Sequence, residues 1–116
     1  MNARELLTGS FRAALTAADP LTIVPRHLPA PPAHGRTVVA GAGKAAAAMA
    51  KAVDLTWPSD APLSGMVVTR YAHGYEDAES PRRIRVVEAA HPVPDAAGET
   101  AAKEIFALAR SLSEED

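Results

Sequence analysis

Residues 38–50 of the chain are Val-Val-Ala-Gly-Ala-Gly-Lys-Ala-Ala-Ala-Ala-Met-Ala, and this stretch decides the fold. It predicts a short apolar strand, a glycine-rich turn and a helix that carries Lys44 at its beginning. In an α/β protein such a turn points backbone N–H groups and the positive end of the helix into one small space. An anion, most often a phosphate, is the natural occupant of that space.

The composition is that of one globular domain or part of one. The chain has 116 residues, of which 47% are hydrophobic, a formal net charge of −2 and no cysteine. The small net charge and the lack of a basic stripe argue against nucleic acid or an anionic membrane as a partner. The lack of cysteine excludes disulfides and a thiol nucleophile. No signal peptide and no apolar run of roughly 20 residues are recognisable, so a cytoplasmic protein is expected.

The hydrophobic pattern predicts the elements on both sides of this stretch. They are a helix at 1–18, a short helix at 21–28 interrupted at Pro25, a strand at 36–40, a helix at 43–57, strands at 63–70 and 84–88, and a helix at 96–112 with Asp95 as its N-cap. The last two strands have no helix between them, so an antiparallel hairpin and a parallel pair both remain open. Residues 71–83 form a loop long enough to suggest a functional role. The expected fold is α/β: a Rossmann-like three-layer sandwich, present in part, with N-terminal helices followed by β-α-β-β-α over residues 1–116.

Helical spacing also predicts which side chains face the core. In the helix at 1–18 the apolar stripe comprises Leu7, Phe11, Ala14, Leu15 and Ala18. In the helix at 43–57 it comprises Ala46, Met49, Ala50, Val53 and Trp57. In the helix at 96–112 it comprises Ala102, Ile105, Phe106, Ala109 and Leu112.

The glycine turn is compatible with more than one kind of ligand. A Walker A loop is rejected, because Val38 stands where its first glycine belongs and Ala45 replaces its Ser or Thr. A dinucleotide fingerprint is satisfied by Gly41, Gly43 and Ala46, but no acidic residue ends the next strand. Arg70 stands there instead and would suit the 2′-phosphate of NADPH better than NAD. The third interpretation is another phosphate-handling site, in which Lys44 and the backbone of residues 41–43, Ala42 included, contact the phosphate. A tight turn with a solvated lysine is the structural alternative.

Side chains after the other strands belong to the same hypothesis, because ligands of open α/β sheets bind outside the carboxyl ends of the strands. Arg70 and His73 follow the second strand, and His91 and Asp95 follow the third. Arg70 could clamp anionic oxygens together with the lysine of the glycine turn. His91 could bind a substrate hydroxyl or transfer a proton, although a structural role is the commoner one for a lone histidine. The spacing of these residues does not suggest a metal site.

Three segments together resemble one family. Residues 38–50, 67–74 (Val-Val-Thr-Arg-Tyr-Ala-His-Gly) and 87–95 (Val-Glu-Ala-Ala-His-Pro-Val-Pro-Asp) are similar to glycerate 2-kinases of the MOFRL type, whose members are often labelled hydroxypyruvate reductases. The resemblance implies phosphorylation of D-glycerate to 2-phosphoglycerate with ATP and Mg²⁺, in a cleft between a Rossmann-like domain and a MOFRL domain. It implies that Lys44 is a site residue and that His73 and His91 line the same cleft. Ala72 departs from the glycine expected between the tyrosine and the histidine.

The resemblance covers only the beginning of the family's N-terminal domain, and the MOFRL domain is absent. The chain is therefore expected to be a fragment or a truncated product with little activity alone, whose partner is the missing portion or a second copy. An NADPH-dependent hydroxypyruvate reductase and a non-catalytic folded remnant are the alternatives.

Overall fold

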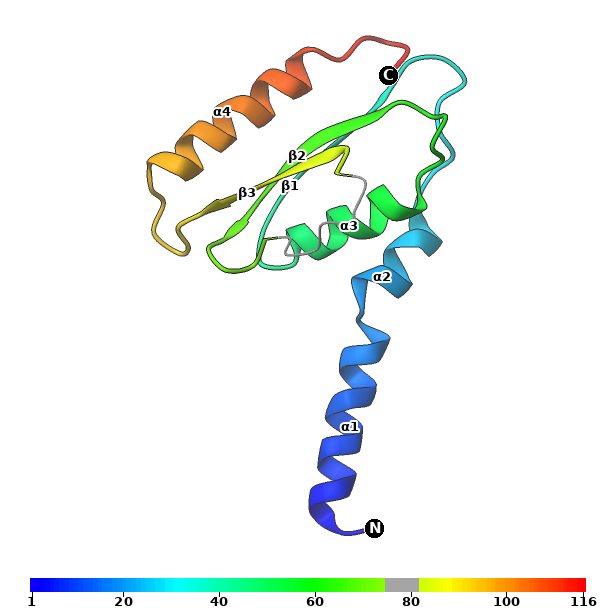
Figure 1. The fold of residues 1–116 in the computed structure, drawn as a ribbon, viewed down its shortest axis with the longest axis vertical. Helices are drawn as coiled ribbons and strands as arrows, with labels where there is room; N and C mark the ends of the chain where they lie inside the picture. Colours follow the sequence, from blue (N-terminus) through cyan, green and yellow to red (C-terminus); the bar gives the residue numbers. More distant parts are fainter. Residues whose placement is uncertain (75–81) are drawn as a thin grey trace.

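The computed structural model describes residues 1–74 and 82–116 (Figure 1). Its elements, in chain order, are α1 (Ala3–Ala17), α2 (Pro20–Ile23), the 3-10 helix η1 (Val24–His27), β1 (Thr37–Ala42), α3 (Ala46–Thr56), β2 (Leu63–Arg70), β3 (Ile84–Ala89) and α4 (Ala96–Arg110). This order of helices and strands is the predicted one, and the bounds of β2 are those predicted from the sequence. The fold is thus a partial α/β sandwich of the Rossmann-like kind.

The described strands form one parallel sheet in the order β1-β2-β3. Val39 pairs with Gly65, and Val67 pairs with Val86, so the third strand runs parallel to the second. The parallel alternative is therefore the correct one of the two left open by the sequence. The connection between β2 and β3 is the predicted long loop, of which residues 75–81 lie outside the described residues. Figure 1 shows α3 and α4 on opposite sides of the sheet, which makes three layers.

The main core lies between α3 and the sheet. Its buried members are Ala46, Ala50, Val53, Trp57, Val67 and Ile84, and Val24 and Leu28 of the N-terminal segment pack against them. The predicted inner face of α3 is confirmed except at Met49, which is 48% exposed. Met49 lies at the margin of the apolar stripe, and Asp54, on the opposite margin, is buried instead.

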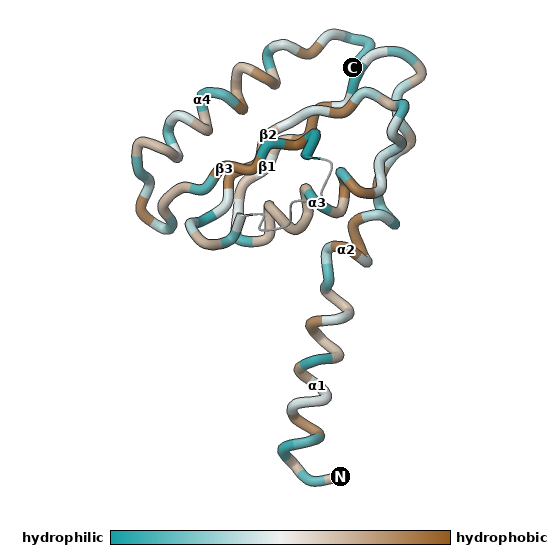
Figure 2. Tube along the Cα trace, in the orientation of Figure 1, coloured by the Kyte–Doolittle hydropathy of each residue, from teal (hydrophilic) through white to brown (hydrophobic). Residues whose placement is uncertain are grey.

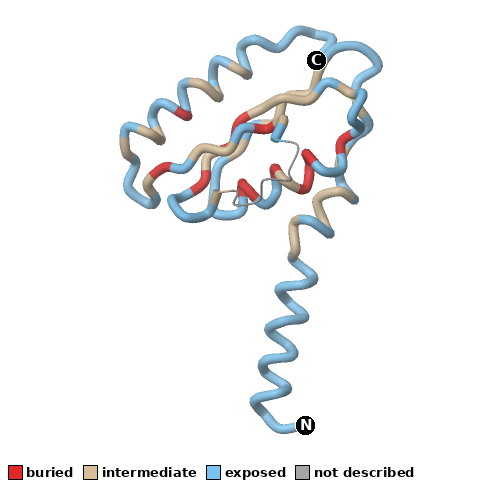
Figure 3. Tube along the Cα trace, viewed as in Figure 1, coloured by how far each residue is buried: buried red, intermediate tan, exposed pale blue. Residues whose placement is uncertain are grey.

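The predicted buried stripe of α4 is wrong. Ala101 is the buried residue of the helix, while Phe106 is 62% exposed and Ala102 is also exposed. The face toward the sheet is centred on Ala101 and is rotated by roughly a quarter of a turn from the predicted one. Alanines occupy most sides of this helix, so the apolar pattern of the sequence indicates only weakly which side faces the sheet. Figure 3 shows α4 mostly in the colours of exposed and intermediate residues.

Helix α1 forms as predicted but does not pack against the sheet. Asn2 and Glu5 make a capping box at its start, and every residue of the helix is exposed. Its apolar side chains are solvated, with Leu7 70% and Phe11 64% exposed. Figures 1 and 2 show the helix extending away from the body of the molecule with its apolar positions uncovered.

The described part of the chain contains no candidate for a membrane-spanning helix. Each helix there is too short or too polar to cross a bilayer.

Candidate functional site

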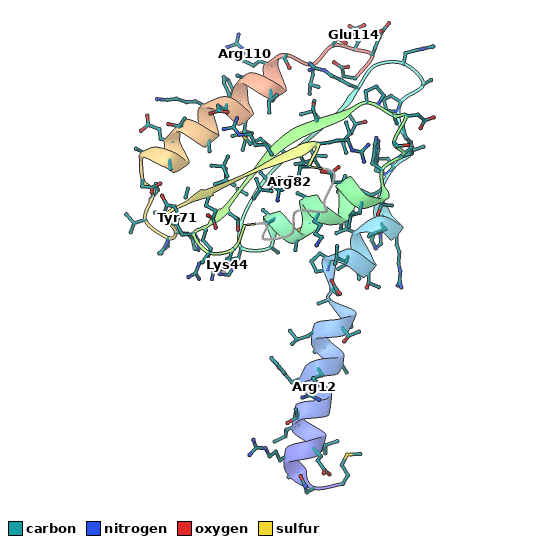
Figure 4. All side chains as sticks on the ribbon, in the orientation of Figure 1. Arg12, Lys44, Tyr71, Arg82, Arg110 and Glu114 are labelled. Atoms are coloured by element: carbon teal, nitrogen blue, oxygen red, sulfur yellow. The ribbon has the colours of Figure 1, made fainter. Side chains whose placement is uncertain are left out.

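The carboxyl ends of the three strands lie at one edge of the sheet because the strands are parallel. The glycine turn follows β1. Arg70 is the last residue of β2 and Tyr71 comes directly after it, while the loop that leads to Asp95 follows β3. Figure 4 shows Lys44 and Tyr71 at this same end of the molecule. The topology therefore brings the predicted site residues to a common edge.

The glycine turn has a left-handed backbone and one open side. Gly43 has a φ of +138°, which disfavours any other residue, and its N–H donates a 3.0 Å hydrogen bond to the carbonyl of Val68. No atom lies within 4 Å of the place where a Cβ of Gly43 would stand. A Cβ at Gly41, by contrast, would make ordinary contact with Val67 at 3.5 Å. The turn is thus fixed to β2 on one side and open to solvent on the other.

Lys44 lies in the turn and not in the first turn of the helix, which corrects the prediction that the helix begins at residue 43. The left-handed conformation of Gly43 ends the strand, and α3 begins only at Ala46. The N-cap residue of α3 is Ala45, which makes no side-chain capping hydrogen bond. The amide N–H groups of the first helical turn therefore lack a side-chain acceptor. Lys44 is exposed, and no hydrogen bond or ion pair to its ammonium exists within residues 1–74 and 82–116. A cation and backbone donors are together available to an anion.

Asp95 joins the loops after β2 and β3. Its Oδ1 accepts a 3.0 Å hydrogen bond from the Gly98 N–H, which confirms it as the N-cap of α4, and its Oδ2 accepts a 2.8 Å bond from the Tyr71 hydroxyl. The Gly98 amide first, and then the Tyr71 hydroxyl, lower the pKa of Asp95. The same hydrogen bond to Asp95 raises the pKa of Tyr71. Both carboxylate oxygens of Asp95 are thus already engaged.

The other predicted binding residues reach the edge without contacting one another. Arg70, His73 and His91 are exposed, and their side chains make no hydrogen bond or ion pair in the described part of the chain. The backbone N–H of His73 donates to the carbonyl of Arg70 at 3.1 Å, which folds this loop into a tight turn. Ala72 in that turn has a φ of +65°, a conformation that favours the glycine expected at this position. Ligand binding by these side chains stays a prediction.

Two residues outside the predicted set of binding residues also shape this region. Tyr71 anchors its loop through Asp95, and Glu88 accepts a 3.2 Å hydrogen bond from the Gly74 N–H. The available signal for each was its position at or next to the carboxyl end of a strand. No group of three or more His, Asp or Glu side chains among the described residues could hold a metal ion.

Two hollows in the described part of the chain lie away from the glycine turn. One of about 700 Å³ follows β3 from Arg83 to Glu88 and reaches Gly74. A second of about 440 Å³ lies between the beginning of β2 and the C-terminal half of α4. Lys44 lines neither of these two hollows and is exposed at the edge of the sheet.

Comparison with known proteins confirms the resemblance predicted from the sequence. Residues 6–116 match the family described as "Domain of unknown function (DUF4147)". A protein of Agrobacterium vitis named "Putative hydroxypyruvate reductase" is 50% identical over 116 residues, which are 100% of this chain and 25% of that protein. A protein of Pyrococcus horikoshii named "Glycerate 2-kinase" is 37% identical over 83 residues, which are 71% of this chain and 17% of that protein.

The match covers the chain far better than it covers the relatives. The chain spans a quarter or less of the length of these relatives. No solved structure matches it significantly. The family assignment rests on almost the whole chain, and the chain therefore belongs to the DUF4147 family.

Proposed function

We propose that this chain carries the phosphate-binding part of an ATP-dependent glycerate 2-kinase, which converts D-glycerate to 2-phosphoglycerate. The observation that supports it is the exposed Lys44, without a partner in the described residues, beside the uncapped beginning of α3. The name of the Pyrococcus horikoshii relative supports the same reaction. Because the chain spans a quarter or less of its relatives, the complete activity is assigned to a longer protein, and the chain alone is expected to be nearly inactive.

The chemistry favours phosphoryl transfer over hydride transfer at this turn. Phosphoryl transfer relies on positioned positive charge around the moving group and the leaving oxygen. Lys44 and the backbone N–H groups at the uncapped beginning of α3 supply such charge. A dinucleotide fingerprint needs close backbone approach and helix packing but has no use for a lysine at this position. The exposed Arg70 is the proposed partner of the glycerate carboxylate.

Magnesium fits the described residues poorly. Of the described carboxylates at this edge, Asp95 accepts hydrogen bonds on both of its oxygens, and Glu88 accepts one from the Gly74 N–H. The described residues offer no cluster of carboxylates. In this proposal Mg²⁺ arrives with the ATP phosphates and finds its protein ligands elsewhere in the longer protein.

A reductase is the second candidate, because Gly41, Gly43 and Ala46 satisfy the dinucleotide pattern and the Agrobacterium vitis relative carries that name. In that case Arg70 would contact the 2′-phosphate of NADPH. The two candidates make different demands on Lys44, since only the kinase requires its charge.

Nucleotide titrations followed by amide NMR test the choice. We expect Mg²⁺–ATP to shift the amide signals of Gly41 and Gly43, and Lys44→Met to weaken this binding about tenfold or more. Such a loss corresponds to the roughly 1.5–3 kcal/mol of a charged hydrogen bond. Lys103→Met is the matched control, because Lys103 lies on α4 and pairs with Glu99.

Other outcomes would overturn the proposal. Binding of NADPH at the glycine turn, with no response to Mg²⁺–ATP, would favour the reductase. Equal affinity of the wild-type chain and the Lys44→Met variant for Mg²⁺–ATP would remove the lysine from the site. Turnover of glycerate by the chain alone at an ordinary kinase rate would contradict its assignment as an incomplete enzyme.

A further inference from the structure

Helix α1 carries an apolar stripe that is exposed along its whole length. Residues three or four positions apart share one side of a helix, and Ala3, Leu7, Phe11, Ala14 and Leu15 lie together in this way. Leu7 is 70%, Phe11 64% and Leu15 57% exposed. Figure 1 shows the helix standing away from the sheet, and Figure 2 shows its apolar positions uncovered. The stripe is therefore a surface without a partner in the described part of the chain.

The helix needs such a partner for its stability. It has 15 residues, and none of them is buried. Isolated helices of about 12–15 residues are marginal in water, and most helical stability in proteins comes from packing of an amphipathic face. The capping box of Asn2 and Glu5 stabilises only the first turn. A second apolar surface along the stripe would supply the rest.

The stripe is symmetric about Phe11. Leu7 precedes Phe11 by four residues, and Leu15 follows it by four. If two such helices lie antiparallel with Phe11 of each on a twofold axis, Leu7 of one copy lies opposite Leu15 of the other, and the same pair forms a second time. A contact of this kind uses one patch on both copies and closes after two of them. The stripe is thus complementary to itself.

The charges of α1 favour the antiparallel arrangement. The helical period places Arg4 beside the stripe and places Glu5 and Arg12 on the far side. A parallel pair would bring the two Arg4 side chains and the two positive helix ends together. The antiparallel pair brings Arg4 opposite Ala18, at the negative end of the other helix, whose last turn has no basic residue. A cation at that end stabilises a helix.

Asp19 adds an acceptor at the same end. It directly follows the C-cap residue Ala18, and its Oδ1 accepts a 3.0 Å hydrogen bond from the Leu21 N–H. Within residues 1–74 and 82–116, its Oδ2 accepts no hydrogen bond and Arg4 has no ion pair. Arg4 of one copy and Asp19 of the other are complementary in charge, and the twofold axis forms this pair twice.

We infer that the stripe of α1 is an interface between two copies of this chain, in which the two helices pack antiparallel about Phe11. Figure 1 shows the body of the molecule at the C-terminal end of α1 only, so the free N-terminal end leaves room for the body of the other copy. Lys44 lies on the body and not on the stripe. The interface is therefore independent of both candidate functions.

Sedimentation equilibrium of the wild-type chain tests the inference. We expect a reversible equilibrium between monomer and dimer. Phe11→Glu should weaken the dimer at least tenfold, because two carboxylates would meet on the axis. Phe106→Glu is the matched control, since Phe106 is an aromatic side chain of α4 that is 62% exposed. Circular dichroism of both variants checks that the fold is unchanged.

Cysteine cross-linking measures the register of the two helices, and the chain has no cysteine of its own. A disulfide needs Cα atoms within about 7 Å of each other, so it reports which residues meet. Phe11→Cys should form a disulfide-linked dimer with itself. Leu7→Cys and Leu15→Cys should each stay unlinked alone and should link when they are mixed.

Three results would overturn the inference. If the wild-type chain stays monomeric, the stripe belongs to the remainder of a longer protein. If Leu7→Cys links efficiently with itself, the helices are parallel. If Phe11→Cys links to Phe106→Cys in preference to itself, α4 of the second copy is the docking surface.

Discussion

The hydroxyl of Tyr71 donates a 2.8 Å hydrogen bond to Oδ2 of Asp95, although the two residues follow different strands. The other oxygen of that carboxylate accepts the Gly98 N–H and caps α4. The backbone N–H of Tyr71 also donates to the Ala89 carbonyl at 3.2 Å. A single carboxylate thus fixes the start of a helix and holds the loop after β2 beside the candidate site.

The first prediction concerns the titration of Tyr71. The hydrogen bond to the Asp95 carboxylate, together with the nearby negative charge, raises the pKa of Tyr71 above its ordinary value of 10.0. The chain has two tyrosines, so a Tyr75→Phe background isolates the signal of Tyr71 in an absorbance titration. Asp95→Asn in this background should lower the pKa of Tyr71, because a neutral amide replaces the anion. Identical titration curves for the two proteins would contradict the hydrogen bond.

The second prediction concerns stability in acid. Hydrogen bonds from Gly98 and Tyr71 hold the pKa of Asp95 below its ordinary value of 3.8. The folded pKa is lower than the unfolded one, so this stabilisation is present above pH 3.8 and is lost as the pH falls through the folded value. Urea unfolding should show wild type more stable than Asp95→Asn at neutral pH, with the difference shrinking in acid.

Asp116 is the natural control for that measurement, because backbone hydrogen bonds from Ser113 and Arg36 also lower its pKa. Asp116→Asn should remove a separate part of the acid sensitivity, and the two effects should add. If Asp95→Asn retains the full difference from wild type at low pH, the assignment of this acid dependence to Asp95 is wrong.

The sequence predicts strands and helices well where one period dominates. The bounds of β2 and the N-cap Asp95 were predictable from an apolar run and from cap chemistry. The parallel pairing of β3 was not predictable, because the sequence of residues 71–83 has no helical pattern that would indicate a crossover connection. The relevant information is the register of Val67 with Val86, which is a tertiary property.

The candidate site was predictable as a set of loops but not as a set of contacts. The glycine turn and the edge position of Arg70 follow from strand order alone. The bond from Tyr71 to Asp95 depends on how far α4 turns over the sheet, and the alanine-rich pattern of α4 does not define that rotation. The sequence does mark Asp54 as unusual, because it is a charged residue beside the apolar stripe of α3.

The third prediction concerns the buried ion pair that closes the end of α3. Arg83 Nε lies 2.8 Å from Asp54 Oδ1, and the Asp54 side chain is 0% exposed. The guanidinium also donates to the carbonyls of Trp57 and Pro58, both at 3.0 Å, while Asp54 Oδ2 accepts the Ile84 N–H. Arg83→Met leaves the buried carboxylate without its charge partner, which costs about 3–5 kcal/mol. Urea unfolding should show this loss or the absence of a cooperative transition.

Two further variants separate charge from geometry. Arg83→Lys keeps the charge but cannot reproduce several donors of a planar guanidinium, so it should restore little stability. Arg85→Met is the matched control, because Arg85 and Glu104 are 62% and 41% exposed, and it should cost at most about 1 kcal/mol. Equal losses for Arg83→Met and Arg85→Met would contradict the structural role of the buried pair.

The last prediction concerns the contact between β1 and β2 at Gly65. A Cβ at this residue would collide with the Val39 carbonyl oxygen and would lie 2.8 Å from the Val39 nitrogen, so Gly65→Ala must push the two strands apart. Backbone atoms cannot give way as a side chain can, and we expect loss of the cooperative unfolding transition. Gly9→Ala is the control, because a Cβ at Gly9 of α1 would meet nothing within 4 Å. Alanine is favoured over glycine in a helix by about 1 kcal/mol, so this variant should gain helical circular dichroism while the transition of the sheet stays unchanged. A normal transition for Gly65→Ala would mean that the register of Val39 with Gly65 is wrong.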